Sequence, residues 1–225
     1  MNKLIYHGSE HIIMNPEYGY GSLANDYGLG FYCTESIELA KEWACIRDMD
    51  GFANYYSLDM DGLTVCNLNE EPYHILNWLA VLTKHRTYWQ KASIAEEAKR
   101  FLQENFYVDV AKFDVVVGYR ADDSYFSFAQ DFVMGTISLE KLSRAMRLGN
   151  LGEQIVLKSQ KAFTHLAYQG NEAAFAQIYY TKKAERDLKA RQDYTMDKKE
   201  PNILDEIYMI DILRGRVDIN DLCIR

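Results

Sequence analysis

The sequence lacks several features, and each absence excludes a class of protein. Its four cysteines (Cys33, Cys45, Cys66 and Cys223) are scattered and form no CxxC pair, which argues against a zinc site and a disulfide framework. No apolar run approaches the ~20 residues of a membrane span, and residues 1–7 lack the apolar core of a secretion signal. We therefore expect a cytoplasmic protein with reduced thiols, no metal and no membrane association.

Excess positive charge is also missing. The 225 residues carry 25 Lys and Arg against 33 Asp and Glu, a formal net charge of −8. Bulk electrostatics therefore give no indication of a nucleic-acid-coating surface, although a local basic patch is compatible with this balance. The chain also has no glycine-rich dinucleotide-binding loop, no internal repeat and no low-complexity linker.

Apolar and aromatic residues, in contrast, are plentiful. About half of the residues (48%) are hydrophobic, which is enough for a substantial core. The 17 tyrosines favour half-buried strands and the walls of pockets. The length suits one large domain, or one domain with a substantial helical insert.

Apolar runs that alternate or are rich in β-branched residues predict the strands. The expected strands are 3–7, 30–33, 54–59, 63–68, 113–119, 153–159 and 165–168. Segment 113–119 is the most β-branched and is expected in the centre of a sheet. Asp61-Gly62 is a hairpin signal, so we expect 54–59 to pair with 63–68.

Apolar residues at three-and-four spacing predict the helices. They are expected from an N-cap at Thr34 to about Arg47, over 72–105, from Ser138 or Leu139 to Arg147, from about Glu172 to Asp197, and briefly within 203–225. Strands and helices do not alternate strictly, which predicts an α+β fold. We expect a domain over 1–170 with a helical insert at about 72–105, and a helical extension over 171–225 packed on it.

Three short motifs lie in order on the expected elements. Tyr6-His7-Gly8-Ser9 ends the first strand, Gly30-Phe31-Tyr32 is followed eleven residues later by Trp43 on a helix, and Glu153-Gln154-Ile155 opens a late strand. Together they resemble the motifs of the mono- and poly-ADP-ribosyltransferases that share the diphtheria-toxin-like catalytic fold. Segments 118–126 and 151–163 also resemble a little-characterised bacterial family of ADP-ribosyltransferase-like proteins of unknown function. The resemblance covers about residues 3–168.

This resemblance implies a fold, a substrate and a reaction. The fold would be a split antiparallel β-sheet with a helical insert and C-terminal helices. The substrate would be NAD, with ADP-ribose transferred to an unknown acceptor, protein or nucleic acid, and nicotinamide released. The protein would then be an enzyme, and one setting is a toxin of a bacterial toxin–antitoxin or phage-defence system with a cognate antitoxin. The alternative is a non-catalytic module that binds NAD or ADP-ribose. A relative of the RNA 2′-phosphotransferases ranks lower, since the paired arginine and histidine residues that it needs are not evident.

The resemblance also assigns roles to the motif residues. His7 would bond the adenosine-side ribose, and the backbone of Gly8, which has no Cβ, would approach the nicotinamide amide, with Ser9 completing this cofactor-binding motif. Tyr32 and Trp43 would sandwich the nicotinamide ring, each contributing on the order of 0.5–2 kcal/mol. Trp43 replaces the usual tyrosine, which keeps the stacking face but loses the phenol.

Two positions compete for the third catalytic residue. A carboxylate on the strand would stabilise the positive charge that develops on the ribose, which favours Glu153. Strand alternation puts Glu153 with Ile155 on the more apolar face, which we expect to point to the core, and Gln154 on the other. This favours Gln154 as the residue in the cleft with Glu153 adjacent, and both remain candidates.

The chain has further charged residues near these motifs. Arg120, Asp122 and Asp123 are candidates for acceptor binding or accessory roles, although Asp122-Asp123-Ser124 is also an ordinary helix cap. The turn-rich segment 11–25 is expected to be a surface loop bordering the site. Basic residues alternate with acids on the expected helix 172–197, and we interpret them as a solvated face: Lys182, Lys183, Arg186, Lys189 and Arg191.

Overall fold

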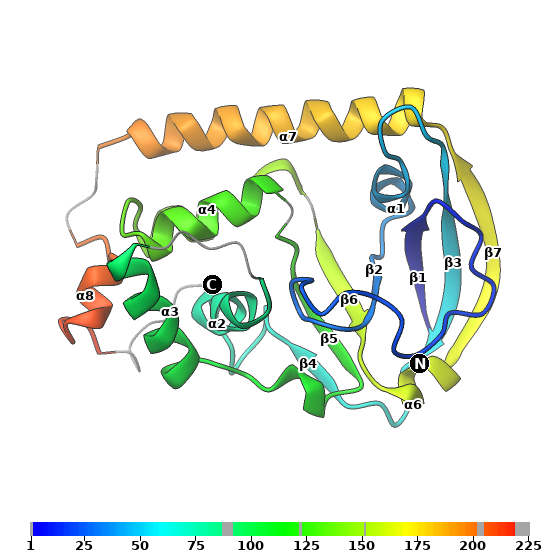
Figure 1. Cartoon of the computed structure of the whole chain (residues 1–225), viewed down its shortest axis with the longest axis horizontal. Coiled ribbons are helices and arrows are strands. Elements are labelled where there is room, and N and C mark those ends of the chain that lie inside the picture. Colours follow the sequence, from blue (N-terminus) through cyan, green and yellow to red (C-terminus); the bar gives the residue numbers. More distant parts are fainter. Residues whose placement is uncertain (1, 87–91, 122, 151, 202–204, 219–225) are drawn as a thin grey trace.

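The computed structural model describes the whole chain except residues 1, 87–91, 122, 151, 202–204 and 219–225. The fold is α+β, as predicted, with two β-sheets and the helices around them (Figure 1). Within this part of the chain, no helix is long and apolar enough to cross a membrane.

One sheet has three antiparallel strands. Its order is β1 (Asn2–Ser9), β3 (Gly51–Asp59) and β7 (Leu166–Ala174). β1 is the first expected strand and is longer than its apolar run. β7 also runs past the predicted end at 168, because it pairs with β3 along its length. The prediction of a helix from about Glu172 is therefore wrong, and the helix begins at Ala176.

The other sheet has four strands. Its order is β2 (Phe31–Cys33), β6 (Glu153–Leu157), β5 (Val115–Tyr119) and β4 (Val65–Asn67). β5 lies inside the sheet, as its β-branched run predicts. β4 pairs in parallel with β5 rather than with β3, so the predicted hairpin is wrong. The turn at Asp61-Gly62 instead carries the chain from one sheet to the other.

The two sheets meet at β1 and β2. The backbone N–H of Tyr6 donates to the Thr34 carbonyl at 2.8 Å, and the N–H of Thr34 donates to the Tyr6 carbonyl at 2.9 Å. Ile5, Tyr56 and Ile155, from both sheets, share one buried apolar cluster. This junction brings the ends of the first two sequence motifs together.

A larger core lies between the four-stranded sheet and the helices. It contains the fully buried Trp78 and Phe128. These helices are α2 (Ile75–His85), α3 (Ser93–Asn105), α4 (Asp123–Val133) and α5 (Leu139–Ala145). The predicted helical block 72–105 therefore contains two helices. Helix α4 was not predicted beyond its cap. Ser138 caps α5 as expected, because its Oγ accepts a hydrogen bond from the Lys141 N–H.

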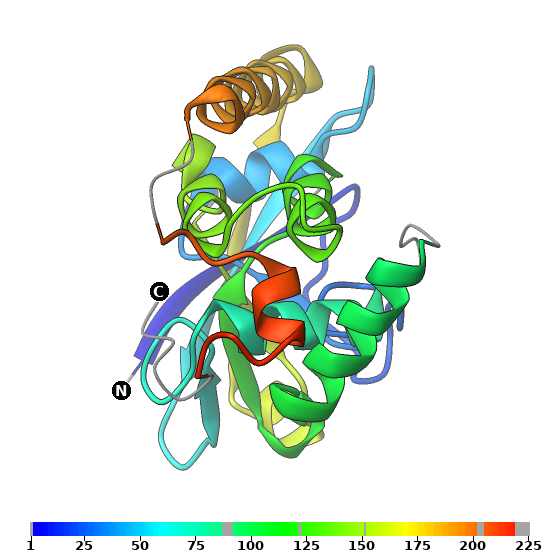
Figure 2. The same cartoon turned by 90° about the vertical axis from the view of Figure 1, so that its left-hand side faces the viewer.

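The remaining helices flank the sheets. α1 (Ile37–Ala44) is capped by Ser36 rather than Thr34, because the Ser36 Oγ accepts from the Leu39 N–H. The long α7 (Ala176–Lys199) lies across one side of the molecule and contacts α1 and α4 (Figures 1 and 2). Helix α6 (Gln160–Thr164) was not predicted, and α8 (Met209–Leu213) lies within the expected final helical segment. Two short 3-10 helices, η1 (Val110–Lys112) and η2 (Leu148–Asn150), complete the described structure. The domain division at residue 170 remains a prediction.

Candidate functional site

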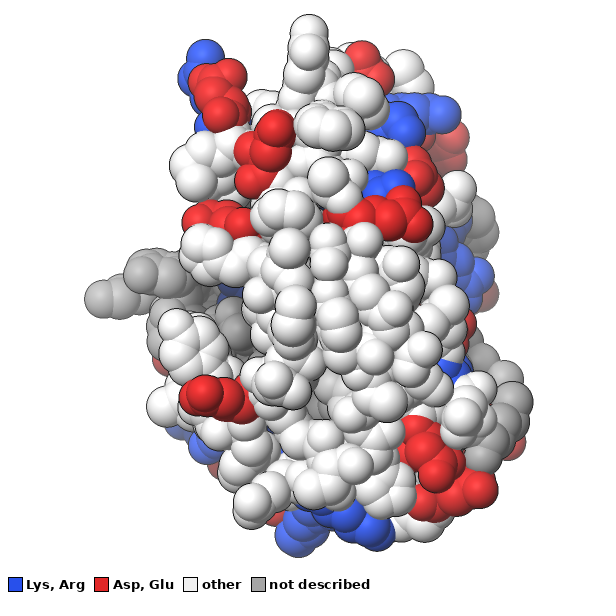
Figure 3. Space-filling view, turned by 90° about the vertical axis from the view of Figure 1, so that its right-hand side faces the viewer, with Lys and Arg blue, Asp and Glu red and all other residues white. Residues whose placement is uncertain are grey.

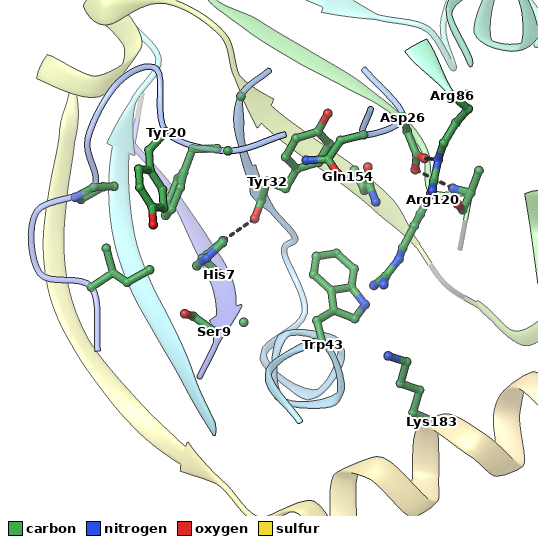
Figure 4. Close-up of a pocket in the computed structure, with 18 of the residues that line it drawn as sticks. His7, Ser9, Tyr20, Asp26, Tyr32, Trp43, Arg86, Arg120, Gln154 and Lys183 are labelled. Atoms are coloured by element: carbon green, nitrogen blue, oxygen red, sulfur yellow. Dashed lines mark hydrogen bonds and ion pairs between the residues drawn. The ribbon is translucent and has the colours of Figure 1, made fainter. Parts of the chain in front are cut away.

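A cavity of about 820 Å³ lies where β1, β2, α1, β6 and α7 come together. Most of the residues singled out from the sequence line it: His7, Gly8, Ser9, Tyr32, Trp43, Arg120 and Gln154 (Figure 4). Glu153 does not line it. Asp122 lies outside the described residues, and nothing is described of the side chain of Asp123.

His7 sits at the end of β1 with its ring stacked on Phe31, centroid to centroid 4.2 Å. Its Nδ1 is 2.7 Å from the carbonyl oxygen of Tyr32, an acceptor, so Nδ1 carries the proton. Burial lowers the pKa of the imidazole, although the bond to Tyr32 opposes this. Near neutral pH the ring is therefore neutral, and its Nε2 is a hydrogen-bond acceptor.

Tyr32 lies on β2 with its ring in the cavity wall. Its hydroxyl donates to the Gly28 carbonyl at 2.5 Å and accepts from the Tyr27 N–H at 3.1 Å. Burial raises the pKa of the phenol well above its usual value. The phenol therefore holds the turn before β2, and the ring face is the part that a ligand can contact.

Trp43 projects from α1 beside Arg120, which follows β5. The Arg120 guanidinium lies over the indole, with Cζ 4.1 Å from the ring centroid. The indole Nε1 is buried and has no hydrogen-bond acceptor in the part of the chain that the structure describes. One face of the indole thus carries a cation.

The two candidates on β6 point in different directions. Gln154 is 6% exposed and lines the cavity, and no described group donates to its Oε1. Glu153 is exposed, and its Oε1 accepts from the Asn69 side chain at 2.8 Å. The two side chains point apart, as strand alternation predicted, but Glu153 is exposed and does not point to the core as expected. The cavity wall at β6 therefore carries an amide in place of a carboxylate.

Gly8 packs against the backbone of α1, and this close packing leaves no room for a side chain at position 8. A Cβ there would lie 2.1 Å from the Ala40 carbonyl oxygen and 2.7 Å from the Ala44 N. The position that a side chain would take is therefore filled by the helix backbone. The missing side chain therefore allows β1 to approach α1, while the approach of the Gly8 backbone to nicotinamide remains a prediction.

The segment between β1 and β2 forms another wall, with Ile13, Glu17 and Tyr20 facing the cavity. It is fixed to β3 by three hydrogen bonds. The Ile13 N–H donates to Asn54 Oδ1 at 2.9 Å, Asn54 Nδ2 donates to the His11 carbonyl at 3.0 Å, and the Tyr56 hydroxyl donates to the Ile13 carbonyl at 2.5 Å.

The comparisons with known proteins bear on the chain as a whole. The model of a family described as "Protein of unknown function (DUF3990)" matches residues 3–168. The chain belongs to the DUF3990 family. Neither the curated proteins nor the solved structures gave a match. The family is thus the little-characterised kind that the sequence predicts, while membership of the ADP-ribosyltransferase superfamily remains a prediction.

Sequence reasoning missed one buried ion pair of this DUF3990 protein. Asp26 is 3% exposed and lines the cavity, and its Oδ1 accepts from Arg86 Nε at 2.7 Å. Its Oδ2 accepts from the Ala121 N–H at 2.9 Å, and Arg86 also donates to the Ala121 carbonyl at 2.6 Å. Burial raises the pKa of Asp26, and Arg86 opposes the shift. The pair fixes the backbone next to Arg120.

Helix α7, beyond the residues that match the DUF3990 family, supplies the last wall. Its Tyr180, Lys183, Asp187 and Arg191 line the cavity, and Arg186 forms an ion pair with the buried Glu42 of α1. The interpretation of the basic residues on this helix as a solvated face is therefore wrong for Lys183 and Arg186, whereas Lys182, Lys189 and Arg191 are exposed. Helical periodicity predicts that the cavity-lining residues of α7 lie on one face of the helix. It does not predict that this face packs against α1 and the cavity.

Within the described ranges, no group of three or more His, Cys, Asp and Glu is placed to hold a metal ion. Cys33, Cys45 and Cys66 are buried free thiols, and burial raises the thiol pKa of each. Cys223 lies outside the described residues.

Proposed function

We propose that this protein binds NAD in the cavity and transfers its ADP-ribosyl group to an acceptor, releasing nicotinamide. One observation supports the proposal above the others. The resemblance assigns His7 on β1, Tyr32 on β2 and Trp43 on α1, and strand alternation favours Gln154 on β6 over Glu153. All four line one cavity although they span most of the matched chain.

The ribose and ring contacts follow from the donors and acceptors in the cavity. The Nε2 of His7 accepts a hydrogen bond from a hydroxyl of the adenosine-side ribose. The cationic nicotinamide ring lies against the faces of Tyr32 and Trp43, where each contact contributes on the order of 0.5–2 kcal/mol. The Trp43 face available to it is the one opposite Arg120.

In the chemical step the bond between nicotinamide and the ribose anomeric carbon breaks, and nicotinamide leaves with the electron pair. A nucleophile of the acceptor bonds to the same carbon, and its proton passes to water. Gln154 binds the adjacent 2′-hydroxyl through Oε1 and orients the ribose. An amide brings a dipole and no charge, so it stabilises the developing cation less than a carboxylate would, and turnover is expected to be slow.

Nicotinamide release from labelled NAD tests the proposal. The wild-type protein should release nicotinamide, and Gln154→Ala should lower the rate at least about tenfold, the loss of roughly one hydrogen bond to the reacting ribose. Glu153→Ala, one residue away but outside the cavity, is the matched control and should keep the rate. Equal rates for the two variants, or no release and no NAD binding, would overturn the proposal.

A second function is supported by the amide on β6. Glu153, the carboxylate of that motif, is bonded to Asn69 outside the cavity, which supports a module that binds NAD or ADP-ribose without turnover. Such a module would be protected thermally by NAD while leaving NAD intact. A role as a toxin with a cognate antitoxin remains a prediction, and testing it requires that the acceptor be identified first.

A further inference from the structure

Tyr20 presents an open aromatic ring at the cavity. It lines the cavity and is 82% exposed, and no aromatic ring of the described residues stacks on it. Phe31 also lines the cavity but is only 9% exposed, and the His7 ring stacks on it at a centroid distance of 4.2 Å. Of these two rings, Tyr20 therefore has the face that a planar ligand can reach.

The start of segment 11–25, which carries Tyr20, is held next to His7. In the pairing of β1 with β3, His7 lies opposite Asn54. The Asn54 Oδ1 accepts from the Ile13 N–H at 2.9 Å, and Ile13 lines the cavity as well. The segment therefore enters the cavity wall at the His7 end.

The chain after Tyr20 returns to the same end. A Cβ on Gly21 would lie 3.5 Å from the carbonyl oxygen of Gly30, which is ordinary van der Waals contact. Gly30 directly precedes Phe31, the residue on which the His7 ring stacks. Tyr20 thus lies between two contacts that both lead to His7, and Figure 4 shows Tyr20 and His7 on the same side of the cavity.

This side of the cavity is poor in positive charge. Residues 7–32 contain no lysine or arginine, and Glu17 adds a carboxylate to the wall. Arg120 and Lys183 lie on the other side of the cavity in Figure 4. The outer face on the side of β7 also has its charged residues mainly near the edges and a broad uncharged centre (Figure 3). An uncharged planar group therefore suits the Tyr20 end better than a phosphate does.

We propose that Tyr20 stacks on the adenine of NAD, so that segment 11–25 recognises the base of the dinucleotide. The inference rests on the proposed function, in which His7 binds the ribose of the adenosine half. Adenine is bonded to C1′ of that ribose, so the base occupies the same end of the cavity as His7. Stacking on an aromatic side chain is a common way in which proteins hold a base without reading its charge.

Calorimetric titration with ADP-ribose and with nicotinamide mononucleotide tests the inference, because only ADP-ribose contains adenine. Tyr20→Ala should weaken ADP-ribose binding about tenfold, or ~1.4 kcal/mol, and leave the affinity for nicotinamide mononucleotide unchanged. Tyr20→Phe keeps the ring and should bind both ligands like the wild type. Tyr18→Ala is the matched control, since Tyr18 is an exposed aromatic residue of the same segment that does not line the cavity.

The outcomes separate this inference from the proposed function. Equal ADP-ribose affinity in Tyr20→Ala and Tyr18→Ala, or no binding of ADP-ribose to the wild type, overturns the inference. It is also overturned if Tyr20→Ala weakens both ligands equally, or if it lowers transfer to an acceptor while ADP-ribose binding stays intact. Absent nicotinamide release with ADP-ribose binding that depends on Tyr20 would instead count against the proposed transfer reaction alone.

Discussion

Tyr32 combines a structural and a ligand-facing part in one side chain. Its hydroxyl is occupied by the Gly28 carbonyl and the Tyr27 N–H, at 2.5 and 3.1 Å. Its ring faces the cavity. Trp43 and Gln154 show the reverse arrangement, because each has a buried polar atom, Nε1 and Oε1, without a partner in the described chain. Buried polar atoms are costly when unpaired, so a ligand that pairs them gains affinity.

The phenol of Tyr32 can be removed without removing the ring. We expect Tyr32→Phe to lower the free energy of unfolding by about 1–3 kcal/mol, because a buried carbonyl and an N–H lose their partner. NAD affinity should stay within about threefold, since the stacking face remains. Urea unfolding and calorimetry measure the two quantities. A variant as stable as the wild type that no longer binds NAD would contradict this assignment.

At the scale of elements, the site depends on how closely β1 approaches α1. Gly8 allows this approach, since the helix backbone occupies the space of a Cβ. The approach holds Trp43 next to the end of β1, where the Trp43 Cβ lies 3.0 Å from the position of that Gly8 Cβ. His7 and Trp43 thus share a cavity because β1 and α1 pack backbone to backbone.

Gly8→Ala tests this packing. We expect the free energy of unfolding to fall by about 1–3 kcal/mol, because the added methyl forces β1 and α1 apart. Ser9→Ala, the next residue on β1, should cost less, since among the described residues the Ser9 Oγ accepts a hydrogen bond from the exposed His11 N–H alone. Chemical denaturation of both variants measures the difference. Equal stability of the two would contradict the packing account.

Local signals in the sequence predicted β1, β5, β6 and the cap of α5, because periodicity and capping are local properties. The hairpin was wrong because pairing depends on distant residues. Asp114 accepts from the Thr64 N–H at 2.8 Å, and this bond and its neighbours tie β4 to β5 rather than β3. No turn signal contains that information.

The site shows the same limit. The motif residues on β1, β2 and β6 could be identified by resemblance, and alternation separated Gln154 from Glu153. The Asp26–Arg86 pair and the α7 wall could not, since each joins segments far apart in the chain. Asp26 and Arg86 lie 60 residues apart. Their charges fit a surface loop and a helix end equally well until the fold brings them together.

At the scale of the whole molecule, burial of several histidines makes stability depend on pH. Burial lowers the pKa of His7 and His74 below 6.5, and burial with the nearby Lys158 lowers that of His85 to about 4. Between pH 7 and 4 the unfolded chain therefore binds protons that the folded chain excludes. Stability is highest above pH 6.5 and falls as the pH is lowered.

Urea unfolding at pH 7.5 and pH 5.0 measures this dependence. We expect a smaller free energy of unfolding at pH 5.0. His85→Gln should reduce the difference between the two pH values, because one of the protons taken up on unfolding is removed. A wild-type protein equally stable at both values, or more stable at pH 5.0, would contradict the assignment of neutral buried imidazoles.

The central claim is that the ends of β1 and β2, with α1 and β6, form one NAD site. A crystal structure of the protein soaked with NAD tests it most directly. We predict the nicotinamide ring between Tyr32 and Trp43, the adenosine-side ribose against His7, and the Gln154 amide at the 2′-hydroxyl of the other ribose. NAD bound away from these residues, or an empty cavity at saturating NAD, would contradict the account.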